Sequence, residues 1–128
     1  MRLVMSVLLI GAAVSACSST VDINPTVVGK WAQANEPPGN SVEMMLATSG
    51  SSISGAGTWC GEALRCGVIT VSGMVNGDVI HLDIVYDSGL IEHFDGRINL
   101  LGVLDGSETG NIPGEPPQLP SAVTFHRT

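Results

Sequence analysis

Basic side chains are scarce in this chain of 128 residues, which has five Lys and Arg residues against twelve Asp and Glu residues. One basic residue, Arg2, precedes an apolar run, and all twelve acidic residues follow that run. A surface that binds nucleic acid needs clustered Lys and Arg to neutralise phosphates. The sequence therefore predicts no nucleic-acid partner and leaves open a basic protein, a cation or a neutral small molecule.

Helical periodicity and the constellations of catalytic sites are also missing. No stretch repeats apolar residues at the i, i+3, i+4 spacing of an amphipathic helix. The serines lie in turns and in a linker without a histidine at a catalytic spacing, and no glycine-rich phosphate loop is present. We therefore expect an all-β protein that is not an enzyme and that needs no cofactor.

The first residues of the chain combine an apolar run with a cysteine. Leu3 to Val14 follow the positive Arg2 and are too few to span a bilayer, as in the apolar region of a signal peptide. The run ends in "VSAC", with the cysteine at Cys17, and this order resembles the lipobox of bacterial lipoproteins. The resemblance implies a signal peptide over residues 1–16, lipidation of Cys17 and a tether over residues 17–25.

The same resemblance predicts where the protein resides. Acyl chains on Cys17 would make the lipid bilayer its first partner. Ser18 follows the cysteine, and by similarity to Gram-negative sorting this favours the periplasmic face of the outer membrane in the cell envelope. The alternative is an ordinary secretory signal with a cysteine at the cleavage point.

Cys60 and Cys66 form an even pair once Cys17 is assigned to lipid. They enclose the five residues "GEALR". Compartments outside the cytoplasm are oxidising and favour disulfides, whereas a metal site would need more Cys or His at ligand spacing. We expect a Cys60–Cys66 disulfide.

Residues 26–128 alternate apolar and polar side chains between turns rich in Gly, Asn, Asp and Ser, which is typical of a strand meander. We expect strands at roughly 26–33, 41–48, 52–60, 66–75, 78–86, 90–99, 101–107 and 121–127. Eight strands close a small barrel, and sixteen glycines suit strongly bent strands. The sequence thus predicts one domain, an eight-stranded antiparallel up-and-down meander barrel.

Two hairpin turns set the register of the central strands. Asn76-Gly77 predicts a two-residue turn that pairs Val75 with Asp78. The three residues from Asp87 to Gly89 predict a three-residue loop that pairs Tyr86 with Leu90. Both registers place the same apolar residues on one face, which we predict to be the core: Ile69, Val71, Ile80, Leu82, Ile84, Leu90, Phe94 and Ile98.

A second resemblance involves both ends of the predicted barrel sequence. "VVGKW", which ends at Trp31, opens the first strand, and Arg127 closes the last. This pair is similar to the pattern of calycins, the lipocalin and avidin-like barrels, in which a late arginine packs over a tryptophan at one barrel end. The alternative is that Trp31 is a core residue of an unrelated small β-sandwich.

Binding is the function that the sequence favours. Glu92 falls on the inward face near Tyr86, and an inward carboxylate needs a partner. We expect these two residues to contact a small apolar ligand in the barrel mouth. The alternatives are a protein-interaction module, such as an inhibitor of a lysozyme or protease, and a purely structural lipoprotein of the envelope.

Two histidines and two aspartates form a chequerboard on the predicted outer face. The three-residue turn places Asp83 opposite His93 and His81 opposite Asp95. Imidazole and carboxylate groups are both zinc ligands, so His81, Asp83, His93 and Asp95 are a candidate metal site. The alternative is a pair of cross-strand ion pairs on the surface.

Overall fold

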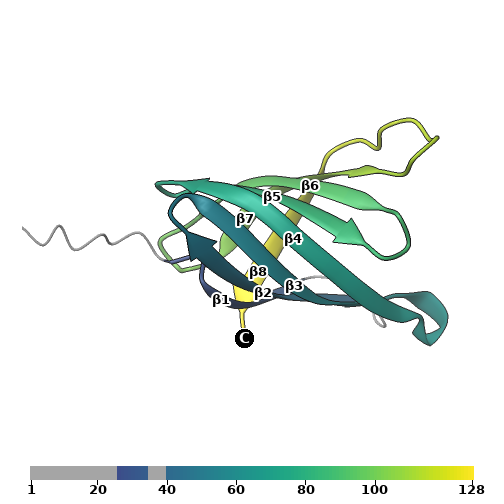
Figure 1. Ribbon diagram of the computed structural model, residues 1–128, viewed down its shortest axis with the longest axis horizontal. Coiled ribbons are helices and arrows are strands. Elements are labelled where there is room, and N and C mark those ends of the chain that lie inside the picture. Colours follow the sequence, from purple (N-terminus) through teal and green to yellow (C-terminus); the bar gives the residue numbers. More distant parts are fainter. Residues whose placement is uncertain (1–25, 35–39) are drawn as a thin grey trace, which may run out of the picture.

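The computed structural model describes residues 26–34 and 40–128. Its strands are β1 (Gly29–Gln33), β2 (Ser41–Ser49), β3 (Ser52–Cys60), β4 (Cys66–Asn76), β5 (Val79–Tyr86), β6 (Ile91–Ile98), β7 (Leu104–Asn111) and β8 (Ser121–Arg127). Each strand pairs antiparallel with the next, and β8 returns to β1 to close a barrel (Figure 1). The predicted all-β, eight-stranded meander barrel is confirmed.

The predicted signal peptide, Cys17 and its tether lie outside the described residues. Among the residues that are described, no helix has the length and the apolar character needed to cross a membrane. One short 3₁₀ turn, Glu62–Leu64, follows β3.

Two predicted strand boundaries are wrong. The first strand begins at Gly29 rather than at residue 26, because Gly29 has φ of +135° and the carbonyls before it accept hydrogen bonds from the Arg127 guanidinium. The strand expected at 101–107 runs from Leu104 to Asn111. The Asn99 side-chain oxygen accepts hydrogen bonds from the backbone at Leu101 and Val103 and holds the preceding segment in a loop.

The register predicted for the first hairpin is also wrong. Asn76 pairs with Val79, so the turn residues are Gly77 and Asp78, and the pairing is shifted by two residues. Gly77 has φ of +63°, which glycine adopts without steric cost. Because strand side chains alternate with a period of two, a two-residue shift leaves every side chain on its predicted face.

The second hairpin has the predicted register. Asp83 pairs with His93, and Leu82 pairs with Phe94. The Tyr86 N–H donates to the Leu90 carbonyl at 2.9 Å, and Gly89 has φ of +94° in the turn. The three-residue loop is therefore confirmed.

The barrel interior is filled by apolar side chains. Of the eight predicted core residues, seven are buried and Leu90 is partly buried against them. Phe94 and Phe125 meet edge to face at 5.5 Å in this interior. Gly57 and Gly73 allow strands to approach closely, since a Cβ at either position would collide with a backbone carbonyl of the neighbouring strand.

The two ends of the barrel are formed by different segments of the chain. We call one the closed end: it contains Thr26, Thr128 and the turns at 50–51, 77–78 and 99–103. We call the other the pocket end: it contains the segments 61–65, 87–90 and 112–120. The up-and-down order places them at opposite ends of the strands (Figure 1).

Candidate functional site

A pocket of about 480 Å³ opens at the pocket end of the barrel. The side chains around it are mostly polar, with two aromatic rings among them. Its lining residues are Gln33, Asn40, Ser41, Val42, Trp59, Cys60, Gly61, Glu62, Tyr86, Glu92, Glu108 and Ser121. They come from β1, β2, β3, β5, β6, β7 and β8 and from the segments beside them, so the closed barrel itself positions the pocket.

Tyr86 and Glu92, the predicted ligand-binding pair, both line this pocket. The Tyr86 hydroxyl donates a hydrogen bond of 2.8 Å to Glu92 Oε2. Glu92 lies opposite Ile84 on the inward face, as the hairpin register predicts. The inward carboxyl group of Glu92 thus has a partner inside the protein, the Tyr86 hydroxyl. A bound ligand would contact this carboxyl group together with Tyr86.

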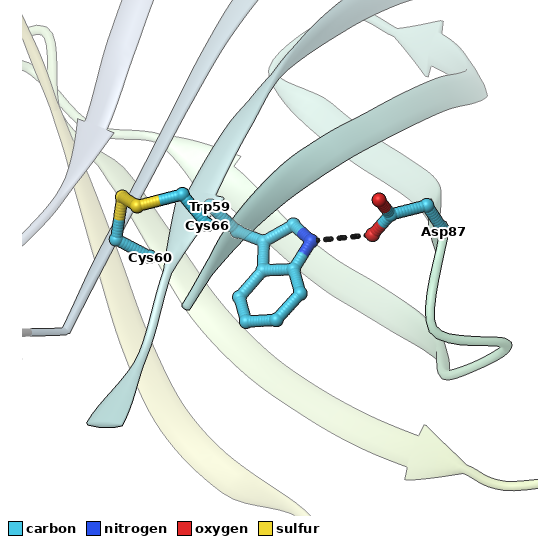
Figure 2. The surroundings of a disulfide bond; sticks show 4 residues. All are labelled: Trp59, Cys60, Cys66 and Asp87. Carbon is cyan, nitrogen blue, oxygen red and sulfur yellow. Dashed lines mark hydrogen bonds between the residues drawn. A yellow bond between two sulfur atoms is a disulfide. The ribbon is translucent and has the colours of Figure 1, made fainter. Parts of the chain in front are cut away.

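Trp59 forms the second aromatic wall of the pocket. Its indole N–H donates to Asp87 Oδ1 at 2.7 Å, and its ring meets the Tyr86 ring edge to face at 6.0 Å. Figure 2 shows the indole beside the Cys60–Cys66 disulfide and directed at Asp87 on the β5–β6 turn. The hydrogen bond from Trp59 holds the pKa of Asp87 below its usual value of 3.8.

The Cys60–Cys66 disulfide confirms the expected cysteine pairing. The two residues are direct cross-strand partners at the ends of β3 and β4, with Cα atoms 4.1 Å apart. The bond closes the short loop that carries Glu62 at the edge of the pocket. Trp59 directly precedes Cys60 in the same strand, so the disulfide lies next to this wall of the pocket.

The pocket is acidic. Three carboxyl groups line it, those of Glu62, Glu92 and Glu108, and its lining contains no Lys, Arg or His. Glu108 is buried, with 7% of its surface exposed. Asn40 Oδ1 is buried as well and accepts no hydrogen bond from the described residues. The pocket therefore presents hydrogen-bond acceptors and negative charge beside two aromatic rings.

Trp31 and Arg127 pair at the closed end, in the arrangement that the resemblance to calycins implies. The Arg127 guanidinium carbon lies 4.4 Å from the centre of the Trp31 ring, and Trp31 is fully buried. The indole N–H donates to the Val27 carbonyl at 2.8 Å. At this end of the barrel a cation therefore lies over a buried aromatic ring.

The four candidate metal-binding residues lie together on the outer face of β5 and β6. Asp83 Oδ1 lies 3.3 Å from His81 Nε2 and 2.5 Å from His93 Nδ1, and Asp95 Oδ1 lies 2.7 Å from His81 Nδ1. The two imidazole rings are nearly parallel, with centres 6.4 Å apart. The hydrogen bond with Asp95 raises the pKa of His81 above 6.5.

Sequence reasoning missed much of the pocket lining. Glu108 was outside every predicted strand, because the strand expected at 101–107 stopped before it. Once β7 begins at Leu104, alternation places Glu108 on the inward face, in agreement with its burial. The strand predicted at 52–60 includes Trp59 without a role for it, although its position beside Cys60 places it at the barrel end.

The fold and the pocket together define a small meander β-barrel with an acidic, aromatic pocket at one mouth. Comparison of the chain with protein-family models, with curated proteins and with solved structures finds no match.

Proposed function

We propose that this protein is a lipid-anchored envelope protein whose barrel binds a small ligand at the pocket end. The pocket of about 480 Å³ carries this proposal, since small-molecule sites usually measure roughly 300–1,000 Å³. A barrel that acted only through its outer surface would need no cavity at its mouth. The proposed activity is binding and not catalysis.

The lining favours an amphipathic ligand over a purely apolar one. Trp59 and Tyr86 provide aromatic surface, and Glu92 and Glu108 provide acceptors on the neighbouring strands. Aromatic faces and carboxylates both attract cations. The ligand class that fits is a small molecule with an apolar or aromatic body and an amine or other donor group.

The position of the pocket suits an anchored protein. The described chain begins at Thr26 at the closed end, and the pocket opens at the other end. If Cys17 is lipidated, the nine residues from 17 to 25 connect the membrane to the closed end. The pocket would then face away from the lipid surface and towards dissolved ligands.

Ligand binding is tested with two matched probes, the protonated amine benzylammonium and neutral benzyl alcohol, followed by the change in tryptophan fluorescence. We expect the cationic probe to bind more tightly. Glu92→Gln should weaken its binding about tenfold, because a hydrogen bond to a charged group contributes roughly 1.5–3 kcal/mol. Glu43→Gln is the control, since Glu43 pairs with Lys30 outside the pocket lining. Equal binding of both probes would contradict the acidic ligand site.

The anchor is tested separately by flotation of membranes from cells that produce the full chain. Cys17→Ser should prevent lipidation and leave the protein in the soluble fraction, because the acyl chains supply the membrane affinity. Membrane flotation of this variant equal to that of the unchanged protein would refute the anchor and leave the pocket proposal intact.

One observation favours a second candidate, a module that binds another protein. Ala63 and Leu64 both have φ of +58°, a conformation that costs a non-glycine residue about 1–2 kcal/mol. Leu64 is 95% exposed on this disulfide-closed loop. A hydrolase inhibitor would use such a loop, and inhibition of lysozyme that Leu64→Asp abolishes would support this candidate over the first.

A further inference from the structure

The outer face of β5 and β6 carries a compact group of metal-binding side chains, on the other face of the sheet from Glu92 in the pocket lining. His81 and Asp83 alternate on β5 with the buried Leu82 between them, and His93 and Asp95 alternate on β6 around the buried Phe94. Each side chain therefore stands on a strand whose other face is fixed in the core. Such a scaffold holds ligand atoms in place before an ion arrives.

Three ligand atoms converge in this group. One atom each from His81, Asp83 and His93 lies within 4.8 Å of the others. A tetrahedral zinc ion has bonds to nitrogen and oxygen of about 2.0–2.2 Å, which places its ligand atoms roughly 3.4 Å apart. The separation of 3.3 Å between His81 Nε2 and Asp83 Oδ1 already has this value. His93 Nδ1 lies closer to Asp83, so a small side-chain rotation would open room for the ion.

Asp95 has a different role from the other three residues. It contacts His81 Nδ1 at 2.7 Å, on the opposite side of the ring from Nε2. When His81 donates its Nδ1–H to this carboxylate, the lone pair of Nε2 is directed at Asp83. Histidine ligands of metals almost always have such an outer partner, which fixes the tautomer and the ring orientation.

The sheet positions next to this group contain no Lys or Arg that could pair with its carboxylates in place of a metal ion. On this outer face the residues paired with the group from β4 are Ser72 and Met74, and those from β7 are Ser107 and Thr109. The next basic side chain along β6, Arg97, contacts Asp78 instead. The two carboxylates therefore have no Lys or Arg partner in the adjacent positions of the sheet.

We propose that His81 Nε2, Asp83 Oδ1 and His93 Nδ1 bind one zinc ion and that Asp95 orients His81. Three protein ligands leave the fourth position of a tetrahedral ion open to water or to an exchangeable ligand. The side chains of the three ligands are 37% to 43% exposed, so an ion here would exchange with the solvent. This site does not depend on the ligand pocket.

The test is calorimetric titration of the metal-free full chain with ZnCl₂. All variants carry Cys17→Ser, because the thiol of an unmodified Cys17 would itself bind zinc. We expect one zinc ion per chain with a dissociation constant tighter than about 100 μM. Failure to bind one equivalent within this limit would overturn the proposal and leave cross-strand ion pairs as the role of the group.

Substitutions of single residues distinguish the proposed zinc ligands from histidines outside the group. His81→Ala and His93→Ala should each weaken zinc binding more than about tenfold, and Asp95→Asn should weaken it about tenfold as an outer partner does. His126→Ala is the matched control, since His126 is exposed on β8 and outside the group. Equal effects of His126→Ala and His81→Ala would refute the assignment.

A calcium titration gives an independent check. Calcium prefers oxygen ligands, whereas the proposed site offers two imidazoles and one carboxylate. We expect calcium to bind at least about tenfold more weakly than zinc. Calcium binding equal to zinc binding would show an acidic surface without a zinc site. Circular dichroism of each variant confirms that the barrel is folded during these measurements.

Discussion

The two tryptophans of the chain lie towards opposite ends of the barrel and are held in different ways. Trp31 is fully buried, donates to a carbonyl of its own strand region and lies under Arg127. Trp59 is partly buried and donates to the carboxylate of Asp87 on a turn. One barrel thus has a sealed end and an open end: Trp31 and Arg127 on the first and last strands close one end, and residues from seven strands and the segments beside them line the pocket at the other.

The largest difference between the two ends should be in the free energy of unfolding that is lost when the tryptophan at each end is removed. Trp31→Ala leaves a cavity among core side chains and should lower the free energy of unfolding by about 3–5 kcal/mol. Trp59→Ala should cost clearly less, because Trp59 is only partly buried. Urea denaturation of both variants measures the difference, and equal losses would contradict it.

Removal of the disulfide at the pocket end should have an intermediate effect on the free energy of unfolding. Cys60 and Cys66 are six residues apart, and the chain-entropy relation gives about 2 kcal/mol for so short a loop. The double variant Cys60→Ser/Cys66→Ser should unfold at lower urea concentration and should change the emission of Trp59 in the native state. The same double change in a Trp59→Phe background is the control. There the native emission of Trp31 should stay constant, and a change would mean that the two ends are coupled.

The smallest expected effect is the pH dependence of the Trp59–Asp87 hydrogen bond. The pKa of Asp87 is lowered in the folded protein, so this bond stabilises the fold above the unfolded value of 3.8. The contribution is lost as pH falls through the lower folded-state pKa. Trp59 emission should therefore titrate with a midpoint below pH 3.8, and Asp87→Asn should remove that transition. A midpoint above 3.8 would contradict the hydrogen bond as the cause.

Much of the fold could be predicted because alternation and turn chemistry act locally. Gly89 in a three-residue turn determined one register correctly. The sequence around Asn76 allows two turns that differ by a two-residue shift, and apolar residues face one another in both. The structure has the turn at Gly77 and Asp78, with glycine at the first turn position, where its φ of +63° carries no steric cost. The predicted core residues are nevertheless correct, because a two-residue shift preserves the alternation of the two faces.

The pocket was less predictable for a different reason. Its residues come from strands that meet only when the ring closes, such as Gln33 on β1 and Glu92 on β6. The polar β7, whose residues from Leu104 to Asn111 include few apolar ones, gives no clear alternation from which to place Glu108. In contrast, His81 and Asp95 share one hairpin, so their contact followed from a single turn.

The closure of the ring also has a consequence for the order in which contacts are expected to form during folding. Seven of the eight strand pairings join strands that are consecutive in the sequence, and only β1 with β8 joins distant ones. Hairpins form in about 1–10 μs, whereas a contact between distant segments must first overcome the entropy of a long loop. Three residue pairs hold that seam, from Trp31 with Arg127 to Gln33 with Phe125. We therefore expect the local hairpins to form first and the β1–β8 seam to close last, so that Arg127 reaches the Trp31 ring in the final step.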